Sequence, residues 1–226
     1  MYTLHITNKN YSSWSLRPWV LMREAAIPFS EILMPFGEGS NWEAFRAFSP
    51  TGRVPVLLDD GRTVWDSLAI IEYLAERHTG VWPSDPDARA FARCIAAEMH
   101  SGFGALRNDC SMNVGVRVAL NAVSPALEAD LARIDEIWSE GLSAFGGPFL
   151  AGEDFCAADA FFCPVAFRIR GYGLELSPES MDYANRLLAL PSMREWENSA
   201  LAETWRDEGH EKDWRLAGTL IEDRRL

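Results

Sequence analysis

The hydrophobic and polar positions of residues 1–80 form short runs that predict strands and helices in alternation. Tyr2 to Thr7 alternates in polarity and is rich in aromatic and β-branched residues, which predicts a strand. From Trp19 to Ala26 apolar residues recur at helical spacing, which predicts a helix that begins near Ser15, its N-cap, with Pro18 in its first turn. Phe29 to Met34 predicts a second strand. Because a helix connects the two strands, they should pair in parallel.

A hairpin and two helices complete this first region. The dipeptide Asp60-Gly61 stands between two short apolar runs, which is typical of a β-hairpin. Trp42 to Phe48 is expected to form a short helix, and Leu68 to Arg77 an amphipathic helix with Ser67 as its N-cap. This order of elements predicts a compact α/β domain of thioredoxin type over residues 1–80.

The composition changes between Thr79 and Pro86, where prolines and a glycine mark a linker that we assign to residues 81–86. Residues 87–226 are expected to form an all-α second domain, because no segment after Pro86 alternates as a strand would. Five segments show helical spacing: Asp87 to about Cys110, Ser124 to about Phe145, Cys156 to about Arg170, Pro178 to Leu190 and Pro191 to Trp205. The charged tail after these segments is expected either to pack or to fray.

Composition and charge argue against several classes of function. Apolar residues make up 48% of the 226 residues, enough for a sizeable core. The 33 acidic and 21 basic residues give a formal charge of −12, and no Lys/Arg cluster marks a phosphate-binding face, which argues against nucleic acid as a partner. No apolar run approaches the length of a membrane span, and no leader pattern follows Met1. We therefore expect a cytoplasmic protein that does not bind a membrane.

The cysteines and histidines do not predict a metal site. The four cysteines include no Cys-x-x-Cys pair, and the four histidines show no metal-ligand spacing with them. Free thiols, as in a reducing compartment, and no bound metal are therefore expected.

Hydroxyl groups gather at two expected helix N-termini. Ser12 and Ser13 stand just ahead of the first helix, where free backbone N–H groups and the helix dipole favour an anion such as a thiolate. Asp66 and Ser67 stand in the same way at the start of a later helix, which is a second helix N-terminus with a hydroxyl group. In both places the alternative is a plain turn or helix cap.

Three groups of residues resemble motifs of the cytosolic glutathione transferase superfamily, and the resemblance covers essentially the whole chain. Ser12-Ser13-Trp14-Ser15-Leu16-Arg17 resembles the serine signature of zeta-class and related bacterial enzymes, with Trp14 where that signature has cysteine. Gly52-Arg53-Val54-Pro55, followed by Asp66-Ser67 and a helical run, resembles the family's glutathione site. Phe155-Cys156-Ala157-Ala158-Asp159 with Pro164 resembles the cap of the family's buried helix. Cys156 replaces the usual Ser or Thr there, so Asp159 would hold the helix start.

The resemblance implies the glutathione transferase fold, a homodimer and glutathione as co-substrate. The helices that follow Ser67 and Asp87 would lie at the dimer interface. Ser13 would donate a hydrogen bond to the glutathione thiolate, with Ser12 as the reserve candidate and Tyr11 as a third possible donor.

The same resemblance assigns the parts of the ligand site. A cis Pro55 would leave the backbone of Val54 free to bind the tripeptide as a strand does. Ser67 would bind the γ-glutamyl carboxylate, with Asp66 and Arg53 at the charged ends of the tripeptide. The second substrate should be an apolar electrophile, although the placement of a histidine and an arginine would also suit an acidic one. The residues expected near it, or else serving only in packing, are Tyr11, Trp14, His100, Phe103 and Arg107, with Phe167, Arg170 and Tyr172 on the buried helix.

Three functions fit these features. The first is a glutathione S-transferase that activates the thiol for addition to an electrophile. The second is a zeta-like, glutathione-dependent cis–trans isomerase of the maleylacetoacetate isomerase kind, in which the thiol adds reversibly. The third is a non-catalytic module of the same fold that contacts other proteins. A glutaredoxin-like disulfide reductase is disfavoured, because no cysteine occupies the loop before the first helix.

Overall fold

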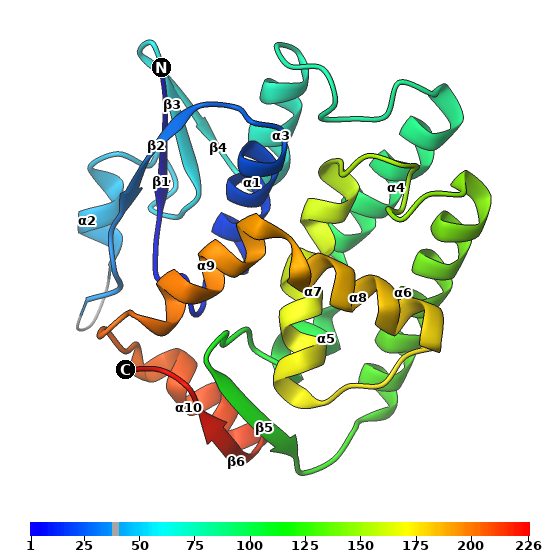
Figure 1. The fold of residues 1–226 in the computed structure, drawn as a ribbon. Helices are drawn as coiled ribbons and strands as arrows, with labels where there is room; N and C mark the ends of the chain where they lie inside the picture. Colours follow the sequence, from blue (N-terminus) through cyan, green and yellow to red (C-terminus); the bar gives the residue numbers. More distant parts are fainter. Residues whose placement is uncertain (38–40) are drawn as a thin grey trace.

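The computed structural model describes residues 1–37 and 41–226 and begins with a four-stranded mixed sheet (Figure 1). The strands are β1 (Tyr2–Ile6), β2 (Phe29–Leu33), β3 (Val56–Asp59) and β4 (Arg62–Trp65), and the helices are α1 (Ser13–Glu24), α2 (Trp42–Arg46) and α3 (Ser67–Ala75). The strand order is β2-β1-β3-β4, with β1 and β2 parallel and the other pairs antiparallel. The predicted order of elements and the parallel pair are confirmed.

The predicted hairpin joins β3 to β4. Asp59 lies opposite Arg62, so Asp60 and Gly61 form the turn. Their φ angles are 45° and 81°, both positive, as a two-residue turn that matches the twist of the strands requires. The hairpin places the end of β4 directly before α3.

The second region is mainly helical. Its helices are α4 (Pro86–Ser101), α5 (Gly104–Asp109), α6 (Pro125–Phe145), α7 (Ala157–Tyr172), α8 (Pro178–Ala189), α9 (Pro191–Leu201) and α10 (Glu208–Ala217). It also contains β5 (Val116–Leu120) and β6 (Gly218–Asp223), which pair antiparallel. The expectation that no strand follows Pro86 is therefore wrong, and the charged tail packs as α10 and β6. The two strands lie far apart in the sequence, so no local turn signal reveals their pairing.

The helix expected from Asp87 to about Cys110 is two helices. Helix α4 ends at Ser101, and Phe103 has a left-handed φ of 58° between α4 and α5. A residue in this conformation stops the helical hydrogen-bond ladder. Arg107 Nε donates to the carbonyl of Gly102 at 2.9 Å and so holds the break.

Two helix starts differ in detail from the sequence patterns, and a third agrees with its motif. Helix α1 begins at Ser13 with Ser12, not Ser15, as its N-cap, so Pro18 lies in the second turn. Helix α3 is capped by Asp66, not Ser67, because the Asp66 carboxylate accepts from Leu68 N at 2.8 Å. At the start of α7, the buried Asp159 accepts from Cys156 N at 2.9 Å, as the motif implied.

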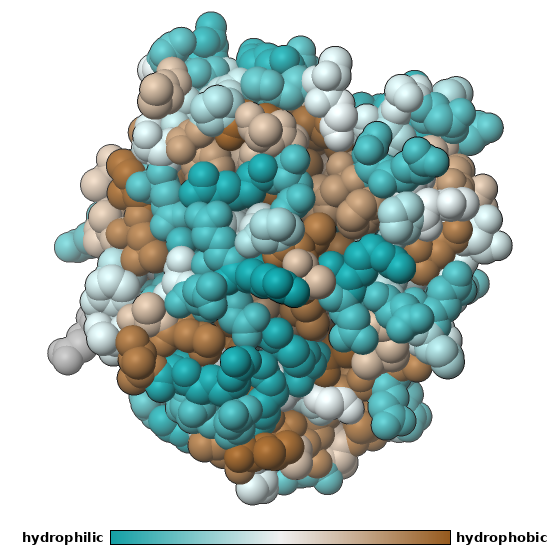
Figure 2. Space-filling view, in the orientation of Figure 1, coloured by the Kyte–Doolittle hydropathy of each residue, from teal (hydrophilic) through white to brown (hydrophobic). Residues whose placement is uncertain are grey.

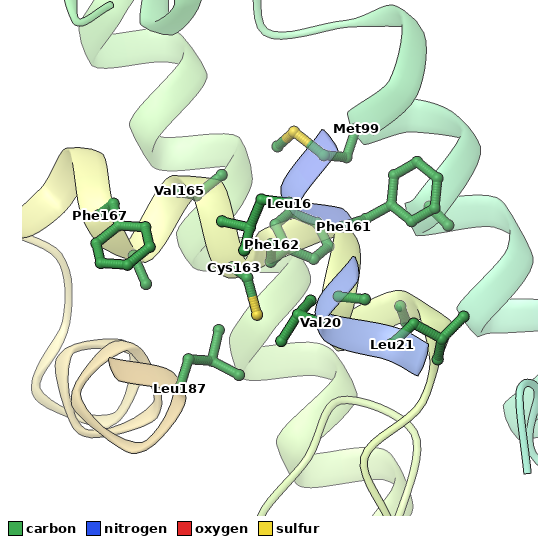
Figure 3. Close-up of a cluster of buried hydrophobic side chains, with 14 of the residues drawn as sticks. Leu16, Val20, Leu21, Met99, Phe161, Phe162, Cys163, Val165, Phe167 and Leu187 are labelled. Atoms are coloured by element: carbon green, nitrogen blue, oxygen red, sulfur yellow. The ribbon is translucent and has the colours of Figure 1, made fainter. Parts of the chain in front are cut away.

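Helix α7 lies at the centre of the hydrophobic core. Every residue of this helix except Arg170 is buried. Figure 3 shows side chains of α1 lying against α7, with neighbours from α4 and α8; the labelled residues are Leu16, Val20, Leu21, Met99, Phe161, Phe162, Cys163, Val165, Phe167 and Leu187. The packing of α1 on α7 fixes the loop before α1 relative to the helical region.

Hydrophilic residues cover much of the face shown in Figure 2, and hydrophobic colour gathers at its lower edge, where Figure 1 places β6. The exposed apolar residues of β6 and of the end of α10 are Leu216, Leu220 and Ile221.

Within residues 1–37 and 41–226, no helix combines the length and the apolar character that a bilayer crossing needs.

Candidate active site

A cleft of about 560 Å³ lies where the segment before β3, the N-terminus of α3 and the first turn of α1 meet. It brings together all five residues that the resemblance assigned to glutathione, together with Trp14. The lining residues are Trp14, Trp42, Thr51, Arg53, Val54, Pro55, Trp65, Asp66 and Ser67. Sequence reasoning missed Thr51, Trp42 and Trp65, because the first lies in a turn, the second on a short helix and the third at a strand end, none of which has a chemical signature.

The segment before β3 presents free backbone groups to the cleft. The Val54–Pro55 peptide bond is cis, as the resemblance implied. Within the described part of the chain, the N–H and C=O of Val54 make no backbone hydrogen bond. Backbone groups need a partner when they are taken from water, so Val54 can pair with an extended peptide as an edge strand does.

The N-terminus of α3 forms the other wall of the cleft. Ser67 is fully buried as a residue, and its hydroxyl receives only a long contact of 3.4 Å from Arg17 Nη1. The Asp66 carboxylate caps the helix and lies 3.5 Å from His100 Nε2. Burial lowers the pKa of His100, so this imidazole is mostly neutral near pH 7 and the contact with Asp66 is not a full ion pair. The wall therefore offers free N–H groups and a hydroxyl, which suit a carboxylate ligand.

The two candidate serines stand at the start of α1 and are nearly buried, with exposed fractions of 9% for Ser12 and 5% for Ser13. Neither lines the cleft itself, although the next residue, Trp14, does. Ser12 Oγ accepts from Ser15 N at 3.3 Å and donates to Ser15 Oγ at 2.8 Å. Ser13 Oγ accepts from Arg168 Nη2 at 3.0 Å. The two hydroxyls thus have different partners.

Three arginines surround Trp14 and Ser13. The guanidinium of Arg17 lies 4.2 Å from the Trp14 ring centre and that of Arg107 lies 5.1 Å from it. Among the described residues, no carboxylate lies within 4 Å of Arg17, Arg107 or Arg168. Burial, and then the other two arginines, lower the pKa of Arg17 well below its ordinary value. The second region therefore brings positive charge without a direct ion-pair partner to the start of α1.

The residues expected near the second substrate are only partly together. Trp14 and His100 meet edge to face at 5.1 Å, and Arg107 lies over the same indole. Tyr11 instead donates to Glu211 Oε1 at 2.7 Å and stacks on His210, so its hydroxyl is engaged away from the cleft. Phe103 is buried in the bend between α4 and α5.

A buttress that sequence reasoning missed holds the serine loop, which comprises residues 8–13. The buried carboxylate of Glu203 accepts from Lys9 N at 2.6 Å and Asn10 N at 3.2 Å. Trp196 Nε1 donates to the carbonyl of Lys9 at 2.9 Å. These contacts link positions almost two hundred residues apart in the chain, so no motif could reveal them.

Comparisons with known proteins show which family the chain is similar to. Residues 11–77 match the family model described as "Glutathione S-transferase, N-terminal domain". A probable maleylacetoacetate isomerase of Caenorhabditis elegans is 29% identical over 175 residues, covering 74% of this chain and 78% of the relative. Glutathione S-transferase hmp2 of Hypomyces subiculosus is 24% identical and covers 83% of this chain and 93% of the relative.

The fold is that of a glutathione transferase. A glutathione transferase homolog from Burkholderia, solved with bound glutathione, aligns with a TM-score of 0.66 and 24% identity over 88% of this chain and 97% of the other. The predicted combination of a thioredoxin-like first region and a helical second region is confirmed. Residues 11–77 therefore match the N-terminal domain of the glutathione S-transferases, and most of the chain is similar to zeta-like members of that superfamily such as the maleylacetoacetate isomerases.

Proposed function

We propose that this protein is a glutathione S-transferase that binds glutathione in the described cleft and activates its thiol for addition to an electrophile. One observation carries the proposal: free backbone groups at Val54 face the N-terminus of α3 across a cleft that reaches the first turn of α1. The residues fit a tripeptide with two charged ends and one thiol.

Each wall has its own role in binding. Val54 would pair with the backbone of the tripeptide, as a strand does at a sheet edge. Ser67 and the N–H groups of α3 would bind the γ-glutamyl carboxylate, and the exposed guanidinium of Arg53 would complement the other end. Asp66 keeps α3 capped and would accept from the γ-glutamyl ammonium.

The first turn of α1 would activate the thiol. An unperturbed thiol titrates near about 8.5, so most of it is protonated at neutral pH, and only the thiolate is a good nucleophile. A hydroxyl that donates to the sulfur at a helix N-terminus favours the charged form. Ser13 is our candidate donor and Ser12 the reserve. The positive charge of the nearby arginines acts in the same direction.

Glutathione-dependent cis–trans isomerisation, in the manner of maleylacetoacetate isomerase, is the second candidate. Several relatives bear that name, including those of Caenorhabditis elegans and Rattus norvegicus. Arginines without carboxylate partners near Trp14 would suit a substrate that carries carboxylates. Product analysis separates the two reactions, because isomerisation recovers the thiol and consumes no glutathione.

The assembly and location of the protein belong to the same proposal. We expect a cytoplasmic homodimer whose interface includes α3 and α4, as the resemblance implies. Between these helices lies a groove of about 570 Å³ lined by Glu72, Ala75, Glu76, Arg77, His78, Thr79, Gly80, Trp82, Pro83, Ser84, Arg89 and Arg93. Sedimentation at several protein concentrations would test the dimer.

The decisive experiment is a calorimetric titration of the protein with glutathione, followed by the ultraviolet absorbance of the bound thiolate. We expect binding by the wild type, and loss of the thiolate signal with binding retained in Ser13→Ala. Absence of binding would contradict the enzyme proposal and favour the third function, a non-catalytic module for protein contacts. Binding with an unchanged thiolate signal in Ser13→Ala would contradict the role of Ser13 alone.

A further inference from the structure

The contact between Arg168 and Ser13 has a defined direction. Arg168 Nη2 lies 3.0 Å from Ser13 Oγ. A guanidinium carries donors and no acceptor, so the serine oxygen must accept. The single proton of the Ser13 hydroxyl is then left for a different acceptor. Among the residues that the structure describes, no acceptor takes it.

Arg168 cannot easily turn away from Ser13. Its Nε donates to the carbonyl of Cys110 at 2.8 Å, and its Nη1 donates to the carbonyl of Pro164 at 3.2 Å. The residue is 6% exposed. With two sides of the planar group held by carbonyls, the remaining nitrogen points to Ser13.

Ser12 differs from Ser13 in this respect. The Ser12 hydroxyl spends its proton on Ser15 Oγ at 2.8 Å, and its oxygen caps the helix. Its proton is therefore already donated, whereas the proton of Ser13 is free. The neighbouring guanidinium is what makes the two hydroxyls unequal.

The positive charge of Arg168 also acts on the sulfur of bound glutathione. No carboxylate lies within 4 Å of it in residues 1–37 and 41–226. Burial, followed by the charge of Arg107, lowers the pKa of Arg168 to about 10, so it stays protonated at neutral pH. A buried cation one hydroxyl away from a sulfur favours the thiolate.

We propose that Arg168 is a positioning residue for thiol activation: it donates to Ser13 Oγ, so that the Ser13 proton is directed to the thiolate. This inference rests on the proposed function, because it concerns the thiol bound there. It assigns a role in thiol activation to a residue of the second region, on a helix that does not line the cleft.

The test measures the pKa of the thiol of bound glutathione, from thiolate absorbance against pH at saturating glutathione. The variants are Arg168→Met, Ser13→Ala and the double variant, with Arg170→Met as the control. Arg170 is two residues away on α7 and pairs with Glu197 instead of Ser13. We expect Arg168→Met to raise the thiol pKa by about one unit, which is about tenfold less thiolate below the pKa, and Arg170→Met to leave it unchanged.

The double variant separates positioning from simple electrostatics. If Arg168 acts through Ser13, its removal after Ser13→Ala should shift the pKa much less than its removal from the wild type. Fully additive shifts, or no shift in Arg168→Met, would overturn the proposal. If Arg168→Met does not fold, Arg168→Lys replaces it. A lysine keeps the charge but cannot hydrogen-bond to both carbonyls and to Ser13 at once. We therefore again expect a raised thiol pKa, and an unchanged thiol pKa would contradict the proposal.

Failure of the role proposed for Arg168 can be distinguished from failure of the proposed function. A shift in Ser13→Ala without one in Arg168→Met overturns only the role of Arg168. No binding of glutathione by the wild type overturns both proposals.

Discussion

The two sides of the serine loop are built in opposite ways. Toward the helical region, buried groups are paired: Glu203 accepts from Lys9 N and Asn10 N, and Glu211 accepts from Tyr11 Oη. Toward the cleft, the backbone of Val54 has no backbone partner among the described residues, and the hydroxyl of Ser67 has only a long one. A buried polar group without a partner costs about 1–3 kcal/mol. We call the side with paired groups, toward the helical region, the closed side, and the side toward the cleft the open side. We infer that the closed side supplies the rigidity that lets the polar groups of the open side remain unpaired until a ligand binds.

The largest expected effect comes from removing the centre of the closed side. Glu203→Ala would leave the N–H groups of Lys9 and Asn10 buried without acceptors. We expect the free energy of unfolding to fall by about 3 kcal/mol and glutathione affinity to fall with it, because the loop loses its support. Urea denaturation and calorimetry measure the two quantities.

The matched control for this change is Glu195→Ala. Glu195 lies on α9, which ends just before Glu203, but is half exposed and pairs with Arg23 at the surface. Exposed pairs contribute about 0–1 kcal/mol, so this variant should be close to wild type in stability and in binding. Equal losses in both variants would contradict the buttress.

The second effect is a pH dependence on the same closed side. Burial alone would raise the pKa of Glu211, but hydrogen bonds from Arg225 and Tyr11 outweigh it, and the pKa lies below its ordinary value of 4.5. A group with a lowered folded pKa contributes stability above its unfolded pKa and loses it as pH falls through the folded pKa. Wild-type stability should therefore drop as pH falls below about 4.5.

Glu211→Gln isolates this contribution. We expect the variant to be less stable than wild type at pH 7 and the difference to shrink as the pH falls below about 4.5. Burial raises the pKa of Glu203, so that group has the opposite pH dependence, but it is present in both proteins and cancels in the difference. Thermal unfolding of both proteins from pH 3.5 to 7 measures the difference in their stability. A difference that does not vary with pH would contradict the predicted contribution of Glu211.

The third prediction concerns the open side. Ser67→Ala should weaken glutathione binding about tenfold, which corresponds to about 1.4 kcal/mol for one lost hydrogen bond to a charged ligand. Stability should change little, because Asp66 caps α3 and the Ser67 hydroxyl has only a weak partner. The control is Ser101→Ala, because Ser101 is exposed and its hydroxyl donates to the carbonyl of Ala97 in the same helix. Loss of stability with unchanged affinity would instead mean that the Ser67 hydroxyl supports the fold and does not bind glutathione.

Much of the fold could be predicted because its signals are local. The hairpin at Asp60-Gly61 and the start of α6 at Ser124, where the hydroxyl accepts from Leu127 N at 3.1 Å, each depend on a few adjacent residues. The pairing of β5 with β6 could not be predicted, since it joins distant segments. Nor could the bend at Phe103, where a contact from Arg107 holds a conformation that phenylalanine rarely adopts.

The candidate site divides in the same way. Arg53, Val54, Pro55, Asp66 and Ser67 could be grouped from motif spacing, and the cleft brings them together. Arg168 could not be found, and the only arginine of this helix that the sequence analysis named was Arg170, which it placed near the second substrate. Helix α7 is apolar almost all round, so its sequence does not show which direction a given residue faces. Arg170 turns to Glu197, and Arg168 turns to Ser13.

The smallest expected effect separates the two serines at the boundary between the two sides. Ser12→Ala removes the cap of α1, whose oxygen accepts from Ser15 N. We expect a loss of about 1 kcal/mol in stability and no change in the thiolate absorbance of bound glutathione, because the Ser12 proton is already donated to Ser15 Oγ. Ser124→Ala removes the equivalent cap of α6, far from the cleft, and should cost about the same. If Ser12→Ala abolished the thiolate signal while Ser13→Ala kept it, Ser12 would be the donor. The contact of Arg168 with Ser13 would then serve only to pack α1 on α7.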